Sequence, residues 1–266
     1  MTAAATALLE GKVAVVTGAG QGIGRGVALQ LAQQGARVVV ADINAETAAE
    51  TAAMVQQRGG DAVAIECDIA DSASVEALVD EVVARFGALH ILINNAYLGN
   101  PPGALETKPA EHFARALQGS FYAPLAAMQR AFPHMKAQGF GRIINMCSLN
   151  GVNAHMYSAD YNVSKEALRC LTRSAAREWA AHGITVNAIC PAARTPAYDR
   201  FAAASPDNAA LLLRQNPSGR MGDPEQDIGA MVSFMCSAGG AYMTGNTVFL
   251  DGGSHINGVS WLPSTR

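Results

Sequence analysis

Three side chains with complementary chemistry, Ser148, Tyr161 and Lys165, stand close together in the sequence. Positions i and i+4 share one face of a helix, so we expect Tyr161 and Lys165 to project in the same direction. An ammonium beside a phenol favours the phenolate, which lowers the tyrosine pKa from about 10 toward neutral pH. Such a tyrosine serves as a general acid or base. Ser148 is expected at the end of the preceding strand, where it offers a hydroxyl to the same reacting oxygen.

A tyrosine and a lysine at this spacing also occur by chance as an exposed helix pair. Whether this pair is functional has to be judged from the elements around it. Short β-branched runs alternate with helical patterns along the chain, which predicts parallel βαβ units and a doubly wound α/β sheet with helices on both faces. The predicted strands cover residues 12–17, 37–41, 62–67, 89–94, 142–147, 184–190 and 247–251.

The predicted helices include a long one over residues 110–138, bent by Pro124, and one that carries Tyr161 and Lys165 to near Gly183. A further helix is predicted over 225–237. Residues 191–224 are irregular but helix-prone, and we interpret them as a lid over a substrate site. No linker or break in composition divides the chain, so residues 1–266 are predicted to form a single domain.

A glycine-rich turn follows the first predicted strand. Gly18, Gly22 and Gly24 open a helical pattern, and Asp42 ends the next strand. Glycines in this context let the backbone approach a pyrophosphate at a helix N-terminus, and the acidic residue accepts hydrogen bonds from a ribose. A carboxylate repels a 2′-phosphate, and Gln21 is neutral, so the cofactor is predicted to be NAD rather than NADP. Arg25, one turn into the helix, is expected to face solvent.

Composition excludes several other classes of protein. Half of the 266 residues are hydrophobic, 15% are charged and the net charge is −3, which gives no basic footprint for nucleic acid. Neither a secretory signal nor an apolar run of about 18 residues is recognisable, so no membrane association is expected. The five cysteines are scattered and no metal-binding spacing occurs. We therefore predict a cytoplasmic protein with reduced thiols and no metal site.

Several motifs in a fixed order resemble those of the short-chain dehydrogenase/reductase family, over essentially the full length. They are TGAGQGIG at 17–24, CD at 67–68, NNA at 94–96, the Ser148, Tyr161 and Lys165 set, CPAART at 190–195 and LDGG at 250–253. The resemblance implies a three-layer Rossmann fold with a seven-stranded parallel sheet. It also implies hydride transfer between NAD(H) and a carbinol carbon, in a homotetramer or a homodimer.

The same resemblance implies a role for each matching residue. Tyr161 would be the acid/base, Lys165 would hold the nicotinamide ribose and lower the Tyr161 pKa, and Ser148 would steady the substrate oxygen. Together with the glycine turn, the residues expected to contact the cofactor are Gly18, Gln21, Gly22, Ile23, Gly24, Asp42, Asp68, Ile69, Asn94, Ala96, Tyr161, Lys165, Pro191 and Thr195.

Three positions depart from the family pattern. Ala116 stands where the family has a fourth catalytic residue, an asparagine thought to help hold a water that relays protons from Lys165 to solvent. We expect a slower or rerouted proton relay with hydride chemistry retained. Tyr97 replaces a glycine and either lines the pocket or lies over the sheet edge. Ala192 replaces a second glycine, after Pro191, and is expected to shift the nearby backbone slightly.

Substrate contacts are expected from loops at the carboxyl ends of the strands. The candidates are Tyr97 and Leu98, Asn150 with residues 153–156, which include His155, and the segment 193–215, which contains Tyr198. A loop histidine such as His155 is more often simply solvated. The sequence around these candidates is mostly apolar and has no clustered Arg or Lys, which predicts a small or medium hydrophobic alcohol or ketone as the substrate. Trp261, in the C-terminal tail, is a candidate for contact with a neighbouring subunit.

The sequence therefore favours an NAD-dependent alcohol dehydrogenase or carbonyl reductase. Two alternatives stay open. One is an NAD-binding sensor or assembly subunit with weakened catalysis, a reading raised by Ala116. The other is an enzyme of the same family that catalyses dehydration or epimerisation.

Overall fold

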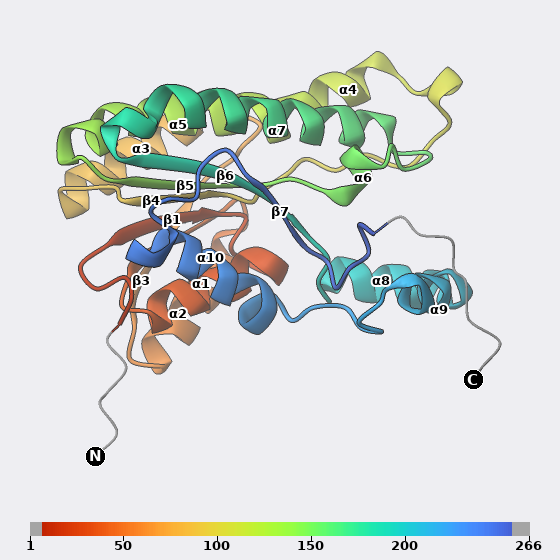
Figure 1. The fold of residues 1–266 in the computed structure, drawn as a ribbon, viewed down its shortest axis with the longest axis horizontal. Helices are drawn as coiled ribbons and strands as arrows, with labels where there is room; N and C mark the ends of the chain where they lie inside the picture. Colours follow the sequence, from red (N-terminus) through yellow and green to blue (C-terminus); the bar gives the residue numbers. More distant parts are fainter. Residues whose placement is uncertain (1–6, 257–266) are drawn as a thin grey trace.

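A seven-stranded sheet forms the centre of the computed structural model, which describes residues 7–256 (Figure 1). All strand pairs are parallel, and the strand order is β3-β2-β1-β4-β5-β6-β7. The strands are β1 (Val13–Thr17), β2 (Arg37–Asp42), β3 (Asp61–Glu66), β4 (Ile91–Asn94), β5 (Gly141–Met146), β6 (Ile184–Pro191) and β7 (Thr247–Leu250). The predicted α/β class, with seven parallel strands, is confirmed.

Helices cover both faces of this sheet. One layer contains α1 (Gly22–Gln33), α2 (Ala45–Gln57) and α10 (Ala230–Cys236), and the other contains α3 (Ser72–Phe86), α5 (Ala123–Gln138) and α7 (Ala159–Trp179). Each layer buries its own hydrophobic cluster against one face of the sheet. Within the described residues, no helix has the length and apolar character needed to cross a bilayer.

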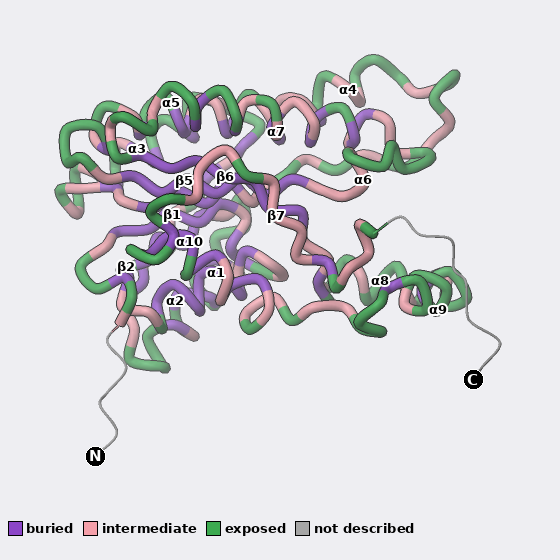
Figure 2. Tube along the Cα trace, viewed as in Figure 1, coloured by how far each residue is buried: buried purple, intermediate pink, exposed green. Residues whose placement is uncertain are grey.

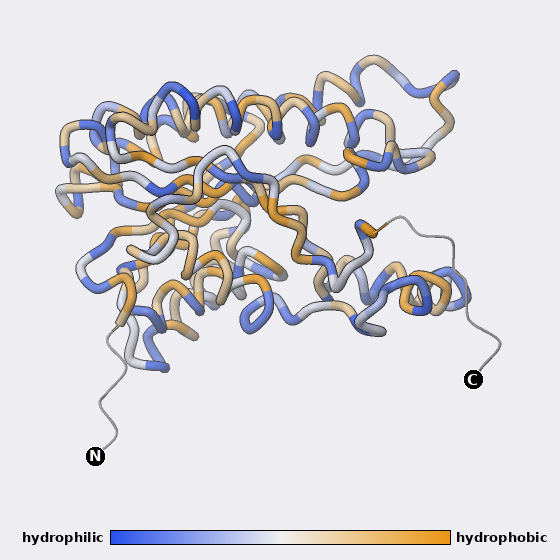
Figure 3. The backbone as a smooth tube through the Cα atoms, viewed as in Figure 1, coloured by the Kyte–Doolittle hydropathy of each residue, from blue (hydrophilic) through white to orange (hydrophobic). Residues whose placement is uncertain are grey.

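The strands themselves are the most buried part of the molecule. Every residue of β1 and β5 is buried, and Figures 2 and 3 show the same core as a buried and largely hydrophobic band. Strands that are buried on both faces are expected to be continuously apolar, as β1 is from Val13 to Val16. This rigid layer fixes where the carboxyl ends of the strands, and the loops that follow them, lie.

The remaining helices lie near the carboxyl ends of the strands. They are α4 (Ala110–Leu117), α6 (Leu149–Val152), α8 (Pro196–Ala204) and α9 (Pro206–Gln215). Figure 1 shows α8 and α9 projecting to one side of the sheet, and Figure 2 shows both as mainly exposed. They occupy the region predicted to form a lid. Trp261 lies outside the described residues.

The long helix predicted over residues 110–138 is interrupted. A π-helical turn, Gln118–Tyr122, separates α4 from α5. Pro124 lacks an N–H and so cannot complete regular α-helical bonding at this point, which is consistent with a wider turn immediately before it. Gly119 in the turn packs against the loop after β4, since an added Cβ would lie 2.6 Å from Leu98 Cγ. The helix predicted over 225–237 likewise begins with a π-helical turn, Pro224–Gly229.

The sheet order reverses at β1, because β1 pairs with β2 on one side and with β4 on the other. Ligands of open α/β sheets bind at such a switch point, outside the carboxyl ends of the strands. Thr17 at the end of β1 fixes the start of the loop after β4, since its Oγ1 accepts hydrogen bonds from the N–H groups of Asn95 and Ala96, at 3.1 and 3.2 Å.

Candidate active site

A cavity of about 410 Å³ runs along the carboxyl ends of the strands. Its size is within the range of small-molecule and cofactor sites. The lining residues are Thr17, Gly18, Gln21, Gly22, Ile23, Ala41, Asp42, Ile43, Cys67, Asp68, Ile69, Asn95, Ala96, Tyr97, Leu98, Met146, Cys147, Ser148, Tyr161, Lys165, Pro191, Thr195, Pro196, Ala197 and Arg200. The cavity thus joins the glycine turn at one end to Ser148, Tyr161 and Lys165 at the other.

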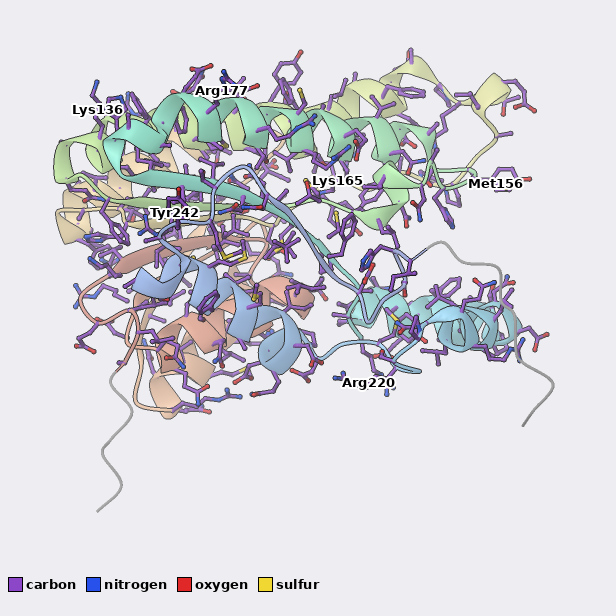
Figure 4. The ribbon with its side chains drawn as sticks, viewed as in Figure 1. Lys136, Met156, Lys165, Arg177, Arg220 and Tyr242 are labelled. Carbon is purple, nitrogen blue, oxygen red and sulfur yellow. The ribbon has the colours of Figure 1, made fainter. Side chains whose placement is uncertain are left out.

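The three residues singled out by their chemistry are brought together here. Ser148 follows β5 and caps α6, where its Oγ accepts the N–H of Asn150 at 3.1 Å. Tyr161 and Lys165 come from one face of α7, and Lys165 Nζ lies 5.6 Å from the centre of the Tyr161 ring. Lys165 is 3% exposed and donates to the carbonyl of Met146 at 2.8 Å. Figure 4 shows it extending from α7 toward the sheet.

Burial, rather than the neighbouring ammonium, dominates the titration of this pair. Desolvation raises the pKa of Tyr161 to about 12, with hydrogen bonding by Ser148 acting in the opposite direction. Desolvation lowers the pKa of Lys165 to about 8. The expectation that Lys165 lowers the Tyr161 pKa is therefore not met in this structure. Tyr161 is held here as a neutral phenol that can donate its proton.

Tyr97 stands beside both catalytic candidates. Its ring packs edge-on against the Tyr161 ring, with centroids 5.9 Å apart, and Lys165 Nζ lies 5.8 Å from its centre. About half of the Tyr97 surface is exposed. Of the two expectations for this residue, the structure supports the one in which it lines the pocket.

The opposite end of the cavity is built from backbone. Gly18 and Gly22 adopt positive φ angles of 63° and 57°, which favour glycine. A Cβ on Gly18 would lie 2.9 Å from Ala96 Cα, and one on Gly24 would lie 2.2 Å from the Gly18 carbonyl oxygen. Gly24 does not line the cavity, so its part is to let α1 pack closely on the turn.

Asp42 supports this turn directly. Its carboxylate accepts the N–H of Gly20 at 2.9 Å and the N–H of Asn44 at 3.1 Å. Arg25 was expected to face solvent, and this is wrong. Its guanidinium donates to the carbonyl of Gly20 and to Thr51 Oγ1, because the close helix–turn packing brings those acceptors within its reach.

Most of the predicted site residues line the cavity, including Asp68, Ile69, Pro191 and Thr195. Asn94 does not. Its amide donates to Asn145 Oδ1 at 2.8 Å inside the sheet, and the adjacent Asn95 faces the cavity instead. Consecutive residues at a strand end point to opposite faces, so a shift of one position exchanges the two roles.

The substrate candidates Tyr97 and Leu98 line the cavity, but Asn150, His155 and Tyr198 lie outside the lining. Asn150 belongs to α6, His155 is exposed with Nδ1 3.3 Å from Ser158 Oγ, and Tyr198 packs against Phe201 with ring centroids 6.3 Å apart. Asn95 is a lining residue that sequence reasoning missed, and Arg200 lies in the candidate segment 193–215 but was not singled out within it. For Arg200, helical spacing from Pro196 was the available signal.

Ala116 is buried, with 2% of its surface exposed, in the last turn of α4. Only Leu117 separates it from the π-helical turn. Its methyl group offers no hydrogen bond, so any water held at this place has to be bound by backbone groups or by other side chains.

The donor set of this cavity suits a nicotinamide dinucleotide. Gly18, Gln21 and Gly22 line the cavity at the N-terminus of α1, where free N–H groups attract a diphosphate, and Asp42 offers a carboxylate to a ribose. Lys165 and Tyr161 stand at the far end, where a nicotinamide ribose and a reacting oxygen would be bound.

The chain belongs to the short-chain dehydrogenase/reductase family, whose members are oxidoreductases that act on CH–OH or carbonyl groups with a nicotinamide cofactor. The family model described as enoyl-(acyl carrier protein) reductase matches residues 18–255. A tropinone reductase homologue of Arabidopsis thaliana is 33% identical over 256 residues, which cover 96% of this chain and 94% of that protein. A 12alpha-hydroxysteroid dehydrogenase of Clostridium sp. is 35% identical over 179 residues, 67% of this chain and 69% of that protein.

Solved structures agree with this assignment. A putative short-chain alcohol dehydrogenase from Sinorhizobium meliloti 1021 superposes with a TM-score of 0.87 at 34% identity, covering 94% of this chain and 98% of its own. The family and the fold predicted from the motifs are confirmed.

Proposed function

We propose that this protein is an NAD-dependent oxidoreductase that interconverts a secondary alcohol and a ketone of small or medium size. The observation that carries the proposal is the single cavity that joins an acidic ribose acceptor, Asp42, to Ser148, Tyr161 and Lys165. The cofactor, when bound, supplies the hydride acceptor or donor. The protein's own residues orient the reactants and transfer the proton.

Tyr161 carries the proton in this proposal. As a neutral phenol it donates its O–H to the substrate oxygen in the direction of reduction and takes the proton back in oxidation. Ser148 offers a second hydroxyl to the same oxygen. Lys165, buried beneath the tyrosine and anchored on the Met146 carbonyl, presents its remaining N–H groups to the nicotinamide ribose.

The preference for NAD rests on the charge at the ribose end. Two backbone N–H groups fix the Asp42 carboxylate at the cavity wall, so a 2′-phosphate would meet a negative charge that cannot easily turn away. The next lining residue is Ile43, which offers no positive charge to a phosphate.

The lining near the reacting end favours an apolar substrate. Tyr97, Leu98, Met146 and Cys147 contribute aromatic, aliphatic and sulfur surface around Tyr161. Tyr97 has the largest side chain of these four, and about half of it is exposed. We propose that the hydrocarbon part of the substrate packs on its ring.

The test is to measure oxidation of a panel of secondary alcohols, and reduction of the matching ketones, with each nicotinamide cofactor. Wild-type enzyme should turn over with NAD(H) and poorly with NADP(H). Asp42→Asn should reduce the ratio of kcat/KM for NAD over NADP by about 10-fold or more, because the repulsion is removed.

Glu46→Gln is the matched control, since it removes an exposed carboxylate from the first turn of α2, outside the cavity lining. It should leave the ratio unchanged. An undiminished NAD preference in Asp42→Asn would show that our account of Asp42 is wrong. No turnover with either cofactor across the panel would remove the oxidoreductase proposal itself.

A further inference from the structure

Charged side chains are few in the cavity, and one of them has no assigned role. The lining contains two carboxylates, Asp42 and Asp68, and two cations, Lys165 and Arg200. Lys165 is buried and bonded to the Met146 carbonyl at the reacting end. Arg200 is exposed, and within residues 7–256 it takes part in none of the side-chain hydrogen bonds or ion pairs. It is the cation in the lining that is available to an incoming ligand.

The carboxylate next to Arg200 in the chain is already engaged. Asp199 accepts from Arg194 Nε at 2.8 Å, on the outside of α8. Arg194 is therefore paired with a carboxylate on its own segment, whereas Arg200, which lines the cavity, has no such partner within residues 7–256. Helical geometry explains the division, because Pro196, Ala197 and Arg200 share one face of α8. All three line the cavity, and Tyr198 does not.

The start of α8 packs on the glycine turn. A Cβ added to Gly22 would lie 3.5 Å from Thr195 Cβ and 3.9 Å from Pro196 Cδ. Thr195 caps α8, with its Oγ1 accepting the N–H of Tyr198 at 3.2 Å. Arg200 stands one helical turn beyond Pro196 on the same face of α8 and lines the same cavity as the glycine turn.

The N-terminus of α1 beneath it is prepared for negative charge. Gln21 at the N-cap makes no capping hydrogen bond with its side chain, and the first turn of α1 carries no acidic residue. The free N–H groups and the helix dipole at such an end attract an anion. A cation from α8 and the helix end of α1 thus line the same cavity.

We propose that Arg200 is an anion clamp carried on α8, which binds the diphosphate of the dinucleotide against the N-terminus of α1. The inference rests on the proposed function, because it takes a dinucleotide as the ligand. A guanidinium makes paired, charge-assisted hydrogen bonds to phosphate oxygens. Binding would also draw α8 toward the glycine turn and so order the segment that borders the substrate.

The test is calorimetric and needs no turnover. Binding of NADH, of ADP-ribose and of adenosine is measured for wild type, Arg200→Met and Arg200→Lys. ADP-ribose retains the diphosphate without the nicotinamide, and adenosine lacks the diphosphate. Arg200→Met should weaken NADH and ADP-ribose by about tenfold, the loss of one good charge-assisted contact, and leave adenosine unchanged. Arg200→Lys should lie between the two proteins.

Salt and position provide further controls. ADP-ribose binding to Arg200→Met should depend less on ionic strength than binding to wild type, because an exposed charge is screened. Arg214→Met removes an exposed cation from α9, outside the cavity lining, and should bind every probe as wild type does. Because Arg200 is exposed, the melting temperature of the ligand-free variants should not change.

Two results would overturn the clamp. One is ADP-ribose binding to Arg200→Met that equals wild type in affinity and salt dependence. The other is unchanged ADP-ribose binding together with a raised KM for the substrate, which would assign Arg200 to an anionic substrate instead. Failure of the wild-type protein to bind NADH or ADP-ribose at all would overturn the proposed function, and with it the clamp.

Discussion

Two ion pairs of nearly equal length lie in the two segments that border the active-site cavity. Lys108 Nζ is 2.9 Å from Asp160, with side chains 2% and 3% exposed, and Arg194 Nε is 2.8 Å from Asp199, with side chains 72% and 51% exposed. Distance alone would rank them as equivalent. Burial separates them, because water screens the outer pair and cannot reach the inner one.

The buried pair is the centre of a small network. Asn100 donates to Asp160 at 2.7 Å and to the carbonyl of His112 at 2.9 Å, and Lys108 also donates to the carbonyl of Pro101 at 2.8 Å. These bonds satisfy both charges, as a buried pair requires. They tie the loop after β4, which carries Tyr97, to the first turn of α7, one residue before Tyr161.

The α8–α9 segment has no comparable anchor along its length. Within α8 no residue is buried, and within α9 only Ala209 is. Few buried contacts mean a low cost of local opening. The two segments therefore differ in rigidity. The loop after β4 and the start of α7 are fixed by a buried ion pair, whereas the α8–α9 segment can move relative to the cavity.

Breaking the buried pair should have the largest effect. Asp160→Asn leaves Lys108 charged and buried without its carboxylate, and should lower the free energy of unfolding by about 3–5 kcal/mol. Asp199→Asn should change it by less than about 1 kcal/mol, because its pair is exposed. Denaturant titration of both variants measures this difference. Equal losses would mean that burial does not distinguish the two regions.

Lys165 is also buried, but unlike Lys108 it is bonded to a backbone carbonyl and not to a carboxylate. Its pKa is lowered to about 8 from 10.5 in the unfolded chain, so unfolding takes up a proton between those values. The contribution of Lys165 to stability should therefore increase as pH rises from about 8 to 10.5, and be lost as pH falls through about 8.

The measurement is the free energy of unfolding of wild type minus that of Lys165→Met, followed across this range. Cys147 and Cys190 lie close enough to interact with Lys165, but burial raises the pKa of both thiols to about 12, so they stay neutral in both folded proteins over this range and cancel in the difference. A difference that is constant with pH, or that shrinks as pH rises, would contradict the desolvation account of Lys165.

The smallest effect is expected at Ala116, on the helix that the buried network anchors through His112. Ala116→Asn supplies a hydrogen-bonding side chain where the family carries one, and should raise turnover a few-fold, most clearly where proton release limits the rate. Ala114→Asn, at an exposed position of the same helix, is the control. A turnover that is unchanged or reduced at every pH would remove the idea of a weakened proton relay.

The sheet, the glycine turn and the grouping of Ser148, Tyr161 and Lys165 could be read from the sequence, because they depend on local periodicity and on fixed spacing. The partnership of Lys108 with Asp160 could not, since neither residue lies in a pattern and only the fold brings them together. The expected lowering of the Tyr161 pKa was wrong because it considered the charge of Lys165 and left out desolvation, which raises the pKa.

Single positions were missed for simpler reasons. Asn94 and Asn95 differ by one step along the chain, and a loop that leaves a strand end decides which of them faces the cavity. Asn150, His155 and Tyr198 were chosen for their chemistry in segments whose path the sequence does not specify. Arg200 was not singled out because residues 191–224 were read as irregular but helix-prone, without the helix start at Pro196 that decides which residues share a face.

Asp42 has a consequence for how this scaffold can evolve. Its carboxylate has about four acceptor positions. Two are occupied by the N–H groups of Gly20 and Asn44, which leaves about two for the hydroxyls of a ribose. A mutation that replaces this carboxylate to admit a cofactor with a 2′-phosphate would also remove the acceptor that holds the Gly20 N–H in the glycine turn. Under the proposed function, a change from NAD to NADP at this position therefore requires a second substitution that restores the turn.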